Sequence, residues 1–540
     1  MKIDIHHATR LHQAQQYQDA EQLYLLLLKQ NNNSNIHYLL GLLYSQTKEF
    51  EKAIQQLEQA FSSHKANPDL YNALAMCYQK TKKNTVAERL INIAISLNPA
   101  NKHYYNRKSK ILISANKLEQ SLNNSLTCLS QHPQFIPAYQ TYAIACDKLH
   151  RPGKRLHIMK KAWKQLPNNP VIAFELAEAY LNTGKYEKAA PLFLALEKHN
   201  FKRMACLNNL GNIERSYGDL SIAQNLYEEA EKLSPENPII QWNLSLLSLL
   251  NENYTDGWNK YDYRLKLKKT STALPLIPTW QGQDLTNKSV IILPEQGLGD
   301  EILFSSSFSQ IITNAKKTVL LCEPRLKPIF EQSFPLAEII EKNDNKYLDI
   351  TYDYQIYAGS ILQHTKNSHI TRQYLKPTKK IQLNKSTLHI GFSWKGGTTY
   401  SDIKKRSIQL KYWRNLLNNK NYHFHCLQHN ISSNEKKILN DYAPNITFLN
   451  SKKDGINDLI NIIASLDLII SVTNTNVHIA GALGVKTWCL TPKNPDWPWG
   501  MNKNQCQWYD SVEMIRKTDN AWHSVLIEIE KKLGEFKRYK

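Results

Sequence analysis

Small and apolar residues recur in the first half of the chain with a period of 34 residues. One helix-like column steps by 34 positions after a first step of 33, and it consists of Ala20, Ala53, Ala87, Ser121, Arg155, Ala189, Ala223 and Gly257. A second column pairs a leucine with a small residue, as in Leu40-Gly41 and Leu210-Gly211. Small residues at fixed positions let paired antiparallel helices pack closely, and recurrent prolines end the second helix of several pairs. The pattern predicts helix pairs to about residue 268.

This 34-residue pattern resembles the tetratricopeptide repeat. The resemblance implies an all-α superhelix of about eight units over residues 1–268, with degraded columns in the fourth, fifth and last units. It also implies a concave surface that holds a peptide or protein segment. A basic stretch at residues 148–164 is typical of a solvated helix face, and a patch for an acidic ligand is the less favoured alternative.

The periodicity changes after Arg264. Residues 265–280 are basic, contain proline and have no helical period, and they predict a linker at residues 269–281. Strand-like runs then alternate with amphipathic segments, which predicts an α/β module with parallel sheets. These runs are SVIIL, TVLLC, DYQIYA, LHIGFSW, YHFHCLQ, ITFLN, LDLIISV and VKTWCLT. A second start at residue 388 predicts two doubly wound lobes, residues 282–387 and 388–540, that face each other across a cleft.

Composition and charge limit the class of partner. The chain has 540 residues and a formal net charge of +21, with 34 basic against 23 acidic residues in 1–270 and 34 against 24 in 271–540. An excess spread so evenly argues against a nucleic-acid-binding tail. The start lacks a secretory signal, no apolar run approaches the roughly 20 residues that span a bilayer, and the eight cysteines form no C-x-x-C pair. We therefore expect a cytoplasmic protein.

Three motifs follow predicted strands, where doubly wound sheets bind their ligands. In the first, PEQGLGD, a glycine turn precedes Asp300 at a helix start, although such an aspartate is more often an N-cap than a catalyst. The second joins hydroxyls, glycines and cations that suit a diphosphate, with an ordinary basic loop as the equal alternative. The third is a helix start rich in hydroxyls and amides, followed by His478. The residues singled out in the three motifs are Gly297, Gly299 and Asp300, then Ser393, Lys395, Lys405 and Arg406, then Thr473, Asn474, Thr475, His478 and Gly481.

Together these motifs resemble GT-B glycosyltransferases of the heptosyltransferase-like kind (glycosyltransferase family 9-like), in bacterial proteins that fuse them to tetratricopeptide repeats. The resemblance rests on PEQGLGD, GFSWKGG with its later RSI, HIAGALG and NPDWPWG, and it spans nearly the whole chain. It implies a metal-independent, inverting transfer of a sugar. The donor would be a nucleotide-sugar, used as co-substrate without a further cofactor, and the acceptor a protein or large glycan held by the repeats.

The resemblance also implies roles for single residues. Asp300 would deprotonate the acceptor hydroxyl, and Gln428 would touch the nucleoside. The donor phosphates would be held by the cations Lys395, Lys405 or Arg406, and by Thr473, Asn474, Thr475 and His478. No metal site is expected, because the chain contains no D-x-D and because His423, His425 and His429 suit a structural role better.

One departure leaves the donor open. Heptosyltransferases of this type carry an aspartate where this chain has Thr473 or Asn474. The architecture is also similar to intracellular enzymes that attach N-acetylglucosamine to protein Ser/Thr, whose repeats present the polypeptide. Two further hypotheses remain: an inactive repeat scaffold for protein–protein interaction, and a lipopolysaccharide or capsule transferase in peripheral contact with anionic membrane. A nucleic-acid partner is the least favoured.

Overall fold

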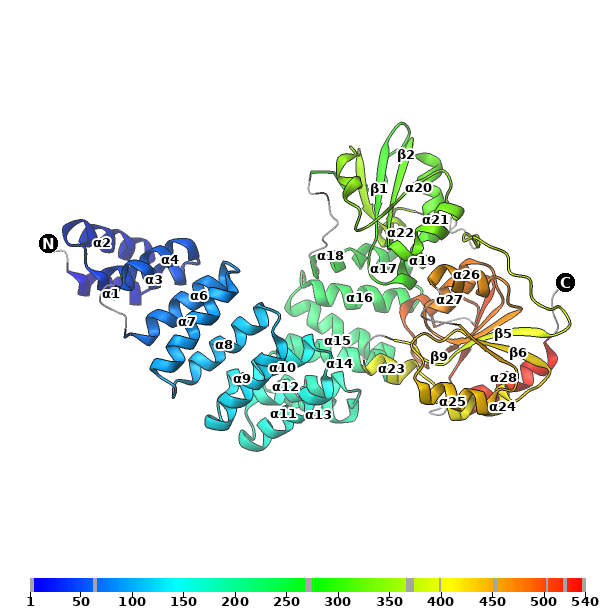
Figure 1. Cartoon of the computed structure of the whole chain (residues 1–540), viewed down its shortest axis with the longest axis horizontal. Helices are drawn as coiled ribbons and strands as arrows, with labels where there is room; N and C mark the ends of the chain where they lie inside the picture. The colour runs from blue at the N-terminus through cyan, green and yellow to red at the C-terminus, as the bar shows by residue number, and fades with distance from the viewer. Residues whose placement is uncertain are drawn as a thin grey trace. The chain divides into compact units, whose positions relative to one another are not determined.

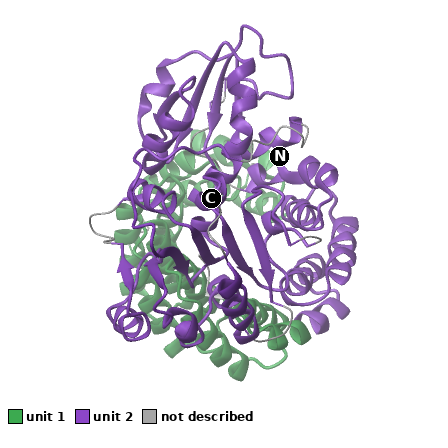
Figure 2. Cartoon of the chain, turned by 90° about the vertical axis from the view of Figure 1, so that its right-hand side faces the viewer, with its two compact units in different colours: residues 1–192 green, residues 193–540 purple. Residues whose placement is uncertain are grey.

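The computed structural model (Figure 1) describes residues 4–61, 66–267, 274, 276–365, 373–397, 400–449, 455–501, 504–517 and 522–536. The chain divides into two compact units, Met1–Leu192 and Phe193–Lys540 (Figure 2). In the described part of the chain, every helix is too short or too polar to cross a lipid bilayer.

Paired helices fill the first unit, as the 34-residue period predicts. They are α1 (Ile5–Gln13), α2 (Tyr17–Gln30), α3 (Ser34–Gln46), α4 (Phe50–Gln59), α6 (Pro68–Lys80), α7 (Asn84–Leu97), α8 (Lys102–Ser114), α9 (Leu118–Gln131), α10 (Ile136–Lys148), α11 (Pro152–Gln165) and α12 (Pro170–Asn182), followed by α13 (Tyr186–Lys198), which ends in the second unit. Asparagine side chains cap the first helix of several pairs by accepting a hydrogen bond from a backbone N–H in the first turn. These caps are Asn33, Asn67, Asn101, Asn169 and Asn237.

The turn inside most pairs contains one residue in the left-handed region. These residues have φ between 54° and 67° and are Gln15, Lys48, Lys82, Asn116, His150, Gly184 and Glu252. The next residue's N–H returns to a carbonyl of the finished helix, as from Glu49 to Tyr44 at 2.8 Å and from Lys83 to Tyr78 at 2.8 Å. This closure stops the first helix and reverses the chain.

The column of small residues lies at the helix contacts. Ala53 and Ala87 are fully buried, and a Cβ on Gly41 would lie 2.6 Å from Leu57 Cγ. Arg155 is the large exception, yet it is only 5 % exposed. Its guanidinium contacts three carboxylates at 2.7 to 3.0 Å, those of Asp147, Glu175 and Glu178. The lysines of the basic stretch 148–164 lie on the exposed face, as the sequence favours.

The second unit begins with the last repeats, α14 (Arg203–Tyr217), α15 (Leu220–Leu233), α16 (Pro238–Leu250), α17 (Tyr254–Tyr261) and α18 (Tyr263–Leu267). These helices share a hydrophobic core with both sheets. The Trp258 ring packs edge-on against Trp497 at 5.4 Å between centroids, and the Tyr261 ring against Phe304 at 6.2 Å. The all-helical part therefore ends at Leu267, but its last repeats belong to the same compact unit as the sheets. Within the predicted linker, residues 269–273 and 275 lie outside the described residues.

The first sheet is parallel, in the order β3-β2-β1-β4. Its strands are β1 (Ser289–Leu293), β2 (Lys317–Cys322), β3 (Glu338–Glu341) and β4 (Tyr354–Tyr357). Val290 pairs with Thr318 on one side and with Tyr354 on the other, so the strand order reverses at β1. The helices of this lobe are α19 (Leu298–Phe304), α20 (Phe308–Asn314), α21 (Lys327–Ser333) and α22 (Ile361–His364), shown in green in Figure 1.

The second sheet is also parallel, in the order β10-β9-β8-β5-β6-β7. Its strands are β5 (Leu388–Ser393), β6 (Tyr422–Cys426), β7 (Ile446–Phe448), β8 (Leu468–Val472), β9 (Thr487–Thr491) and β10 (Val512–Arg516). Its helices are α23 (Tyr400–Arg406), α24 (Arg414–Leu417), α25 (Ser433–Tyr442), α26 (Ile456–Ile463), α27 (Thr475–Ala482) and α28 (His523–Glu535). The strand order reverses between β5 and β8, and ligands of doubly wound sheets bind at such a switch point.

All eight strand-like runs of the sequence form strands. The pattern missed β3 and β10 because these strands of four and five residues, EIIE and VEMIR, contain two charged residues each and so lack a continuous apolar run.

Candidate functional site

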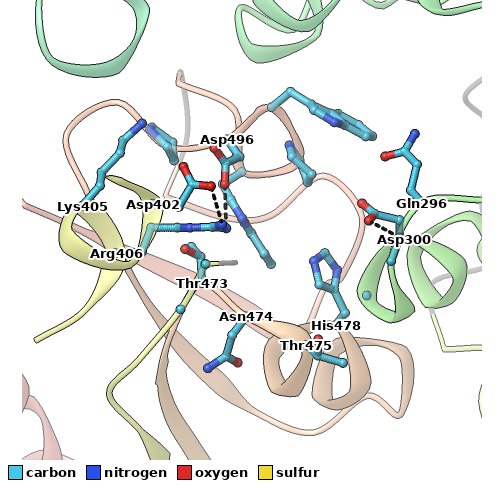
Figure 3. A pocket seen from close by; sticks show the side chains of 18 of the residues that line it. Gln296, Asp300, Asp402, Lys405, Arg406, Thr473, Asn474, Thr475, His478 and Asp496 are labelled. Carbon is cyan, nitrogen blue, oxygen red and sulfur yellow. Dashed lines mark hydrogen bonds and ion pairs between the residues drawn. The ribbon is translucent and has the colours of Figure 1, made fainter. Parts of the chain in front are cut away.

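A polar pocket of about 550 Å³ lies where the carboxyl ends of β1 and β8 approach each other (Figure 3). Ten of the residues singled out in the sequence line it: Gly297, Gly299, Asp300, Lys395, Lys405, Arg406, Thr473, Asn474, Thr475 and His478. A second pocket of about 480 Å³ shares Lys395, Asn474 and Thr475 with the first and adds Gln428. The structure therefore brings together segments that lie up to about 180 residues apart in the chain.

Asp300 stands at the third position of α19 and faces the first pocket. Its carboxylate Oδ2 accepts a hydrogen bond from the backbone N–H of Gly297 at 3.0 Å, which caps the helix. Burial raises the pKa of Asp300, and the nearby Glu295 and Asp496 carboxylates add to the rise, while the Gly297 N–H opposes it. The N-cap itself is Gly297, and Asp300 caps it from the third helical position, so Asp300 is not the N-cap that its place in the sequence suggests. This capping and a role in proton transfer are compatible, because the cap uses one carboxylate oxygen.

His478 lies on α27 and is buried beside the pocket. Its Nδ1 lies 3.0 Å from the Tyr509 hydroxyl, and its ring packs on Trp499 at 4.9 Å. Burial lowers its pKa to about 3, so the imidazole is neutral at physiological pH. Gly299 allows this arrangement, because a Cβ there would lie 3.0 Å from His478 Cδ2. Helices α19 and α27 can thus pack together across the two lobes.

Cations gather on the other side of the pocket, at the end of α23. Arg406 Nη1 lies 2.7 Å from Asp496 Oδ2, and its Nη2 lies 3.9 Å from Asp402 Oδ2 (Figure 3). Burial alone would raise the pKa of Asp496, but Arg406, Lys405 and Arg215 lower it overall. Burial lowers the pKa of Lys405 to about 8. Arg406 is therefore held by carboxylates, whereas Lys405 is a cation with a weakened hold on its proton.

The start of α27 supplies neutral donors to the same wall. Asn474 caps the helix by accepting from the Asn476 N–H, and its side-chain amide donates to Ser393 Oγ at 2.9 Å and to the Lys395 carbonyl at 3.1 Å. Thr473 Oγ1 is buried, lines the pocket and has no hydrogen-bond partner among the described residues. Buried hydroxyls without partners are uncommon, so Thr473 offers an unused hydrogen-bonding group to a ligand.

Three of the predicted residues lie elsewhere. Ser393 is fully buried and bonds Ser471 and Asn474, so it can reach a ligand only through these neighbours. Gly481 faces the core, where a Cβ would overlap the Tyr509 ring. Gln428 lines only the second pocket and accepts from the backbone N–H groups of residues 394 and 395.

Two of the histidines and the lysine near that strand end also have protein partners. His423 bonds the Thr447 hydroxyl at 2.7 Å, and His425 lies 3.0 Å from His389 Nδ1. His429 lines the second pocket. Lys395 forms an ion pair with Glu435.

Several pocket residues were missed in the sequence. Asp496 lies inside NPDWPWG, a motif that by itself suggests no role for this residue. Arg215 and Trp242 come from the repeat helices α14 and α16, together with Leu246 and Leu250. The repeat period predicts that these positions are helical, but nothing in it indicates that they wall a pocket.

The chain is thus a repeat protein with a C-terminal pair of parallel α/β lobes, and its N-terminal repeats are tetratricopeptide repeats. The family described as "Tetratricopeptide repeat" matches residues 34–66, and "YpiA-like, tetratricopeptide repeats" matches residues 156–201. Repeats of this kind stack into surfaces that bind other chains. The N-terminal part accordingly has the architecture of a protein-interaction scaffold.

Among curated proteins the chain is similar to Protein FlbA of Caulobacter vibrioides (strain ATCC 19089 / CIP 103742 / CB 15), with 23% identity over 445 residues, 75% of this chain and 74% of FlbA. Among solved structures it is similar to pilF of Pseudomonas aeruginosa, at 18% identity and a TM-score of 0.32, over 38% of this chain and 95% of that one. A tetratricopeptide repeat protein from Parabacteroides merdae ATCC 43184 matches at 15% identity and a TM-score of 0.36, over 45% of this chain and 97% of that one.

Proposed function

We propose that the protein is an inverting glycosyltransferase that moves a sugar from a nucleotide-sugar to a hydroxyl on a protein or large glycan acceptor. The observation that carries the proposal is the pocket itself. A half-buried carboxylate, Asp300, comes from one lobe. The other lobe contributes a cluster of cations and the Thr473 hydroxyl, which has no hydrogen-bond partner in the described part of the chain. Transfer from a sugar diphosphate needs a base at one end and charge stabilisation at the other.

Asp300 acts as the base in this proposal. The acceptor oxygen attacks the anomeric carbon while Asp300 takes the hydroxyl proton, and the bond between that carbon and the phosphate oxygen breaks. Its raised pKa suits the task, because a stronger base accepts the proton more readily.

The departing diphosphate is stabilised on the opposite wall. Arg406 presents a guanidinium whose Nε has no partner among the described residues, and Lys405 and the Thr473 hydroxyl lie in the same pocket. The start of α27 adds backbone N–H groups and the positive end of the helix dipole. The nucleoside fits the second pocket, where Leu427, Ile456 and Leu459 offer apolar contacts beside Gln428.

The acceptor enters past the repeats. Trp242 and Leu246 of α16 line the pocket together with Asp300, so a chain bound to the last repeats would reach the base directly. This arrangement supports a polymeric acceptor over a small one.

The test combines donor binding with turnover. We expect one class of UDP-, GDP-, ADP- or CMP-linked sugar to raise the thermal unfolding midpoint of the full chain, since a ligand stabilises the folded state it binds. Asp300→Asn should keep this shift, because the asparagine oxygen can still cap Gly297. Turnover, measured as release of the nucleotide, should fall by about 100-fold to 10,000-fold.

Asp458→Asn is the matched control. Asp458 is also the third residue of a helix capped by a glycine, Gly455, but it is exposed and lines neither pocket. It should leave turnover unchanged. If no nucleotide-sugar shifts the midpoint, or if Asp300→Asn turns over like Asp458→Asn, the protein is not this enzyme, and the inactive scaffold becomes the better hypothesis.

A further inference from the structure

A buried polar network joins the end of the repeats to the loop that leads to Asp300. Arg264 of α18 forms two hydrogen bonds with Glu295, from Nε to Oε2 and from Nη2 to Oε1, each at 2.6 Å. Its remaining donors reach Ser360 Oγ, Asp262 Oδ1 and the Tyr261 carbonyl at 2.7 to 3.0 Å. The Arg264 and Glu295 side chains are only 6 % and 5 % exposed.

The loop held by this network runs directly into the capped helix. Gln296, next to Glu295, has φ of 61°, a left-handed conformation that is strained for a non-glycine residue. Its side-chain Nε2 donates to the Tyr261 hydroxyl at 2.9 Å. Gly297 follows and donates its N–H to the Asp300 carboxylate. Residues 295 and 296 are thus hydrogen-bonded to repeat residues, and residue 297 is hydrogen-bonded to the proposed base.

We propose that Tyr261 and Arg264 are positioning residues that set the place and direction of the Asp300 carboxylate. This inference rests on the proposed function. Neither residue lines the pocket, so both act through the loop 295–297. The repeat domain then does more than gather an acceptor, because its last turn fixes the geometry of the catalytic carboxylate.

The energetics favour a geometric role over simple stabilisation. A buried ion pair gains little net stability, since removing both charges from water offsets their attraction. A bidentate guanidinium–carboxylate pair does fix relative orientation closely. The left-handed Gln296 needs such support, because strained backbone persists only where neighbours hold it.

Tyr261→Phe is the sharpest test, since it removes only the hydroxyl that holds Gln296. We expect kcat to fall about ten-fold, because the variant loses roughly one hydrogen bond that holds the loop and, through it, the carboxylate in place. The KM for the nucleotide-sugar and the Kd for the free nucleoside diphosphate should not change, because the diphosphate lies on the other lobe. Tyr227→Phe is the matched control. Tyr227 lies 34 residues earlier, is also buried, and its hydroxyl donates to Asn212 within its own repeat.

Arg264→Lys extends the test, because lysine keeps the positive charge but cannot form the bidentate guanidinium–carboxylate pair. It should lower kcat at least as much as Tyr261→Phe, with Arg203→Lys, whose partner Glu197 lies on the repeats, as its control. Equal kcat in Tyr261→Phe and Tyr227→Phe, or a rise in KM alone, would overturn the positioning role.

Hydrogen exchange separates this inference from the enzymatic one. Backbone amides of residues 297–302 should exchange about ten-fold faster in Tyr261→Phe than in the wild type, and at the wild-type rate in Tyr227→Phe. If the wild type transfers no sugar, the proposed function fails while the exchange rates still decide whether Tyr261 orders the loop. Unchanged exchange in Tyr261→Phe would reject the inference even in an active enzyme.

Discussion

Burial sets the protonation of the pocket side chains in opposite directions. It raises the pKa of the Asp300 carboxyl and lowers those of His478 and Lys405, the latter two to about 3 and about 8. At neutral pH the imidazole is therefore neutral and the lysine is still charged. In the proposed transfer, His478 therefore contributes no positive charge to the leaving group, and Arg406 and Lys405 supply that charge.

Transfer should therefore show a bell-shaped dependence on pH. Asp300 must be ionised to accept a proton, so the rate rises as pH increases through its raised pKa. Lys405 must be protonated, so the rate falls above pH about 8. Asp496 and Asp402 raise the pKa of Lys405, and Arg215 and Arg406 lower it together with burial. Lys405→Arg should extend activity to higher pH, since a guanidinium stays charged. If the alkaline limb of the kcat–pH profile does not shift in Lys405→Arg, Lys405 is not the group that causes the loss of rate at high pH.

Asn474 makes two hydrogen bonds that an aspartate at this place could not make. Its amide donates to Ser393 and to the Lys395 carbonyl, and a carboxylate cannot donate either bond. Asn474→Asp should lower the free energy of unfolding by about 1–3 kcal/mol and weaken donor binding. Asn33→Asp is the control, because Asn33 caps α3 only by accepting, which aspartate does equally well. Equal urea midpoints for the two variants would contradict this account.

Short motifs could be predicted because their residues are consecutive. Thr473 directly follows β8, and Asp300 and His478 lie in the first turn of the helices that come after β1 and β8, so the strand ends place all three at the switch point. Asp496 and Arg215 could not be found this way. One sits in a loop whose fold depends on Trp258 and Phe304, and the other on a repeat helix whose neighbour is set by tertiary packing.

Helix and strand elements follow closely from the sequence pattern. The period of 34 predicts the helix pairs because each small residue meets the facing helix, and the buried strands read as continuous apolar runs. The asparagine caps every 34 residues are a further signal that the small-residue columns overlook. The pattern does not identify strands β3 and β10, because each lies at the edge of its sheet and contains charged residues.

Close helix contact makes a definite prediction at this scale. Gly41→Ala would push a Cβ to 2.6 Å from Leu57 Cγ and 3.1 Å from its backbone nitrogen. We expect the free energy of unfolding to fall by about 1–3 kcal/mol. Gly153→Ala, where a Cβ meets nothing within 4 Å, should be neutral or stabilising by up to about 1 kcal/mol. Urea unfolding of both variants checks this, and a stable Gly41→Ala would show that α3 and α4 can move apart.

The whole molecule divides at Leu192 rather than where the helices end. The last repeats, through Trp258 and Tyr261, complete the core beneath both sheets. The positive charge is spread evenly along the sequence and does not follow this division into two units. Two of the cations, Lys405 and Arg406, line the pocket.

Fragments should therefore differ in folding. A fragment of residues 193–540 keeps the shared core and should unfold cooperatively. A fragment of residues 282–540 exposes Trp497, Phe304 and Trp508, and should bind a hydrophobic dye and aggregate. Thermal scans with dye fluorescence check this. A cooperative, dye-free transition in the shorter fragment would mean that the lobes fold without the repeats.

The left-handed turns of the repeats carry a consequence for how this protein can change. Gly184 alone among those turn residues is glycine; lysine, asparagine, glutamine, histidine and glutamate occupy the rest at a cost of roughly 1 kcal/mol each. Substituting glycine at any one of these positions would remove this conformational cost from its own repeat. Repeats contact mainly their neighbours, so such gains would accumulate nearly independently. Selection can thus tune the rigidity of the repeats one unit at a time, leaving the pocket residues untouched.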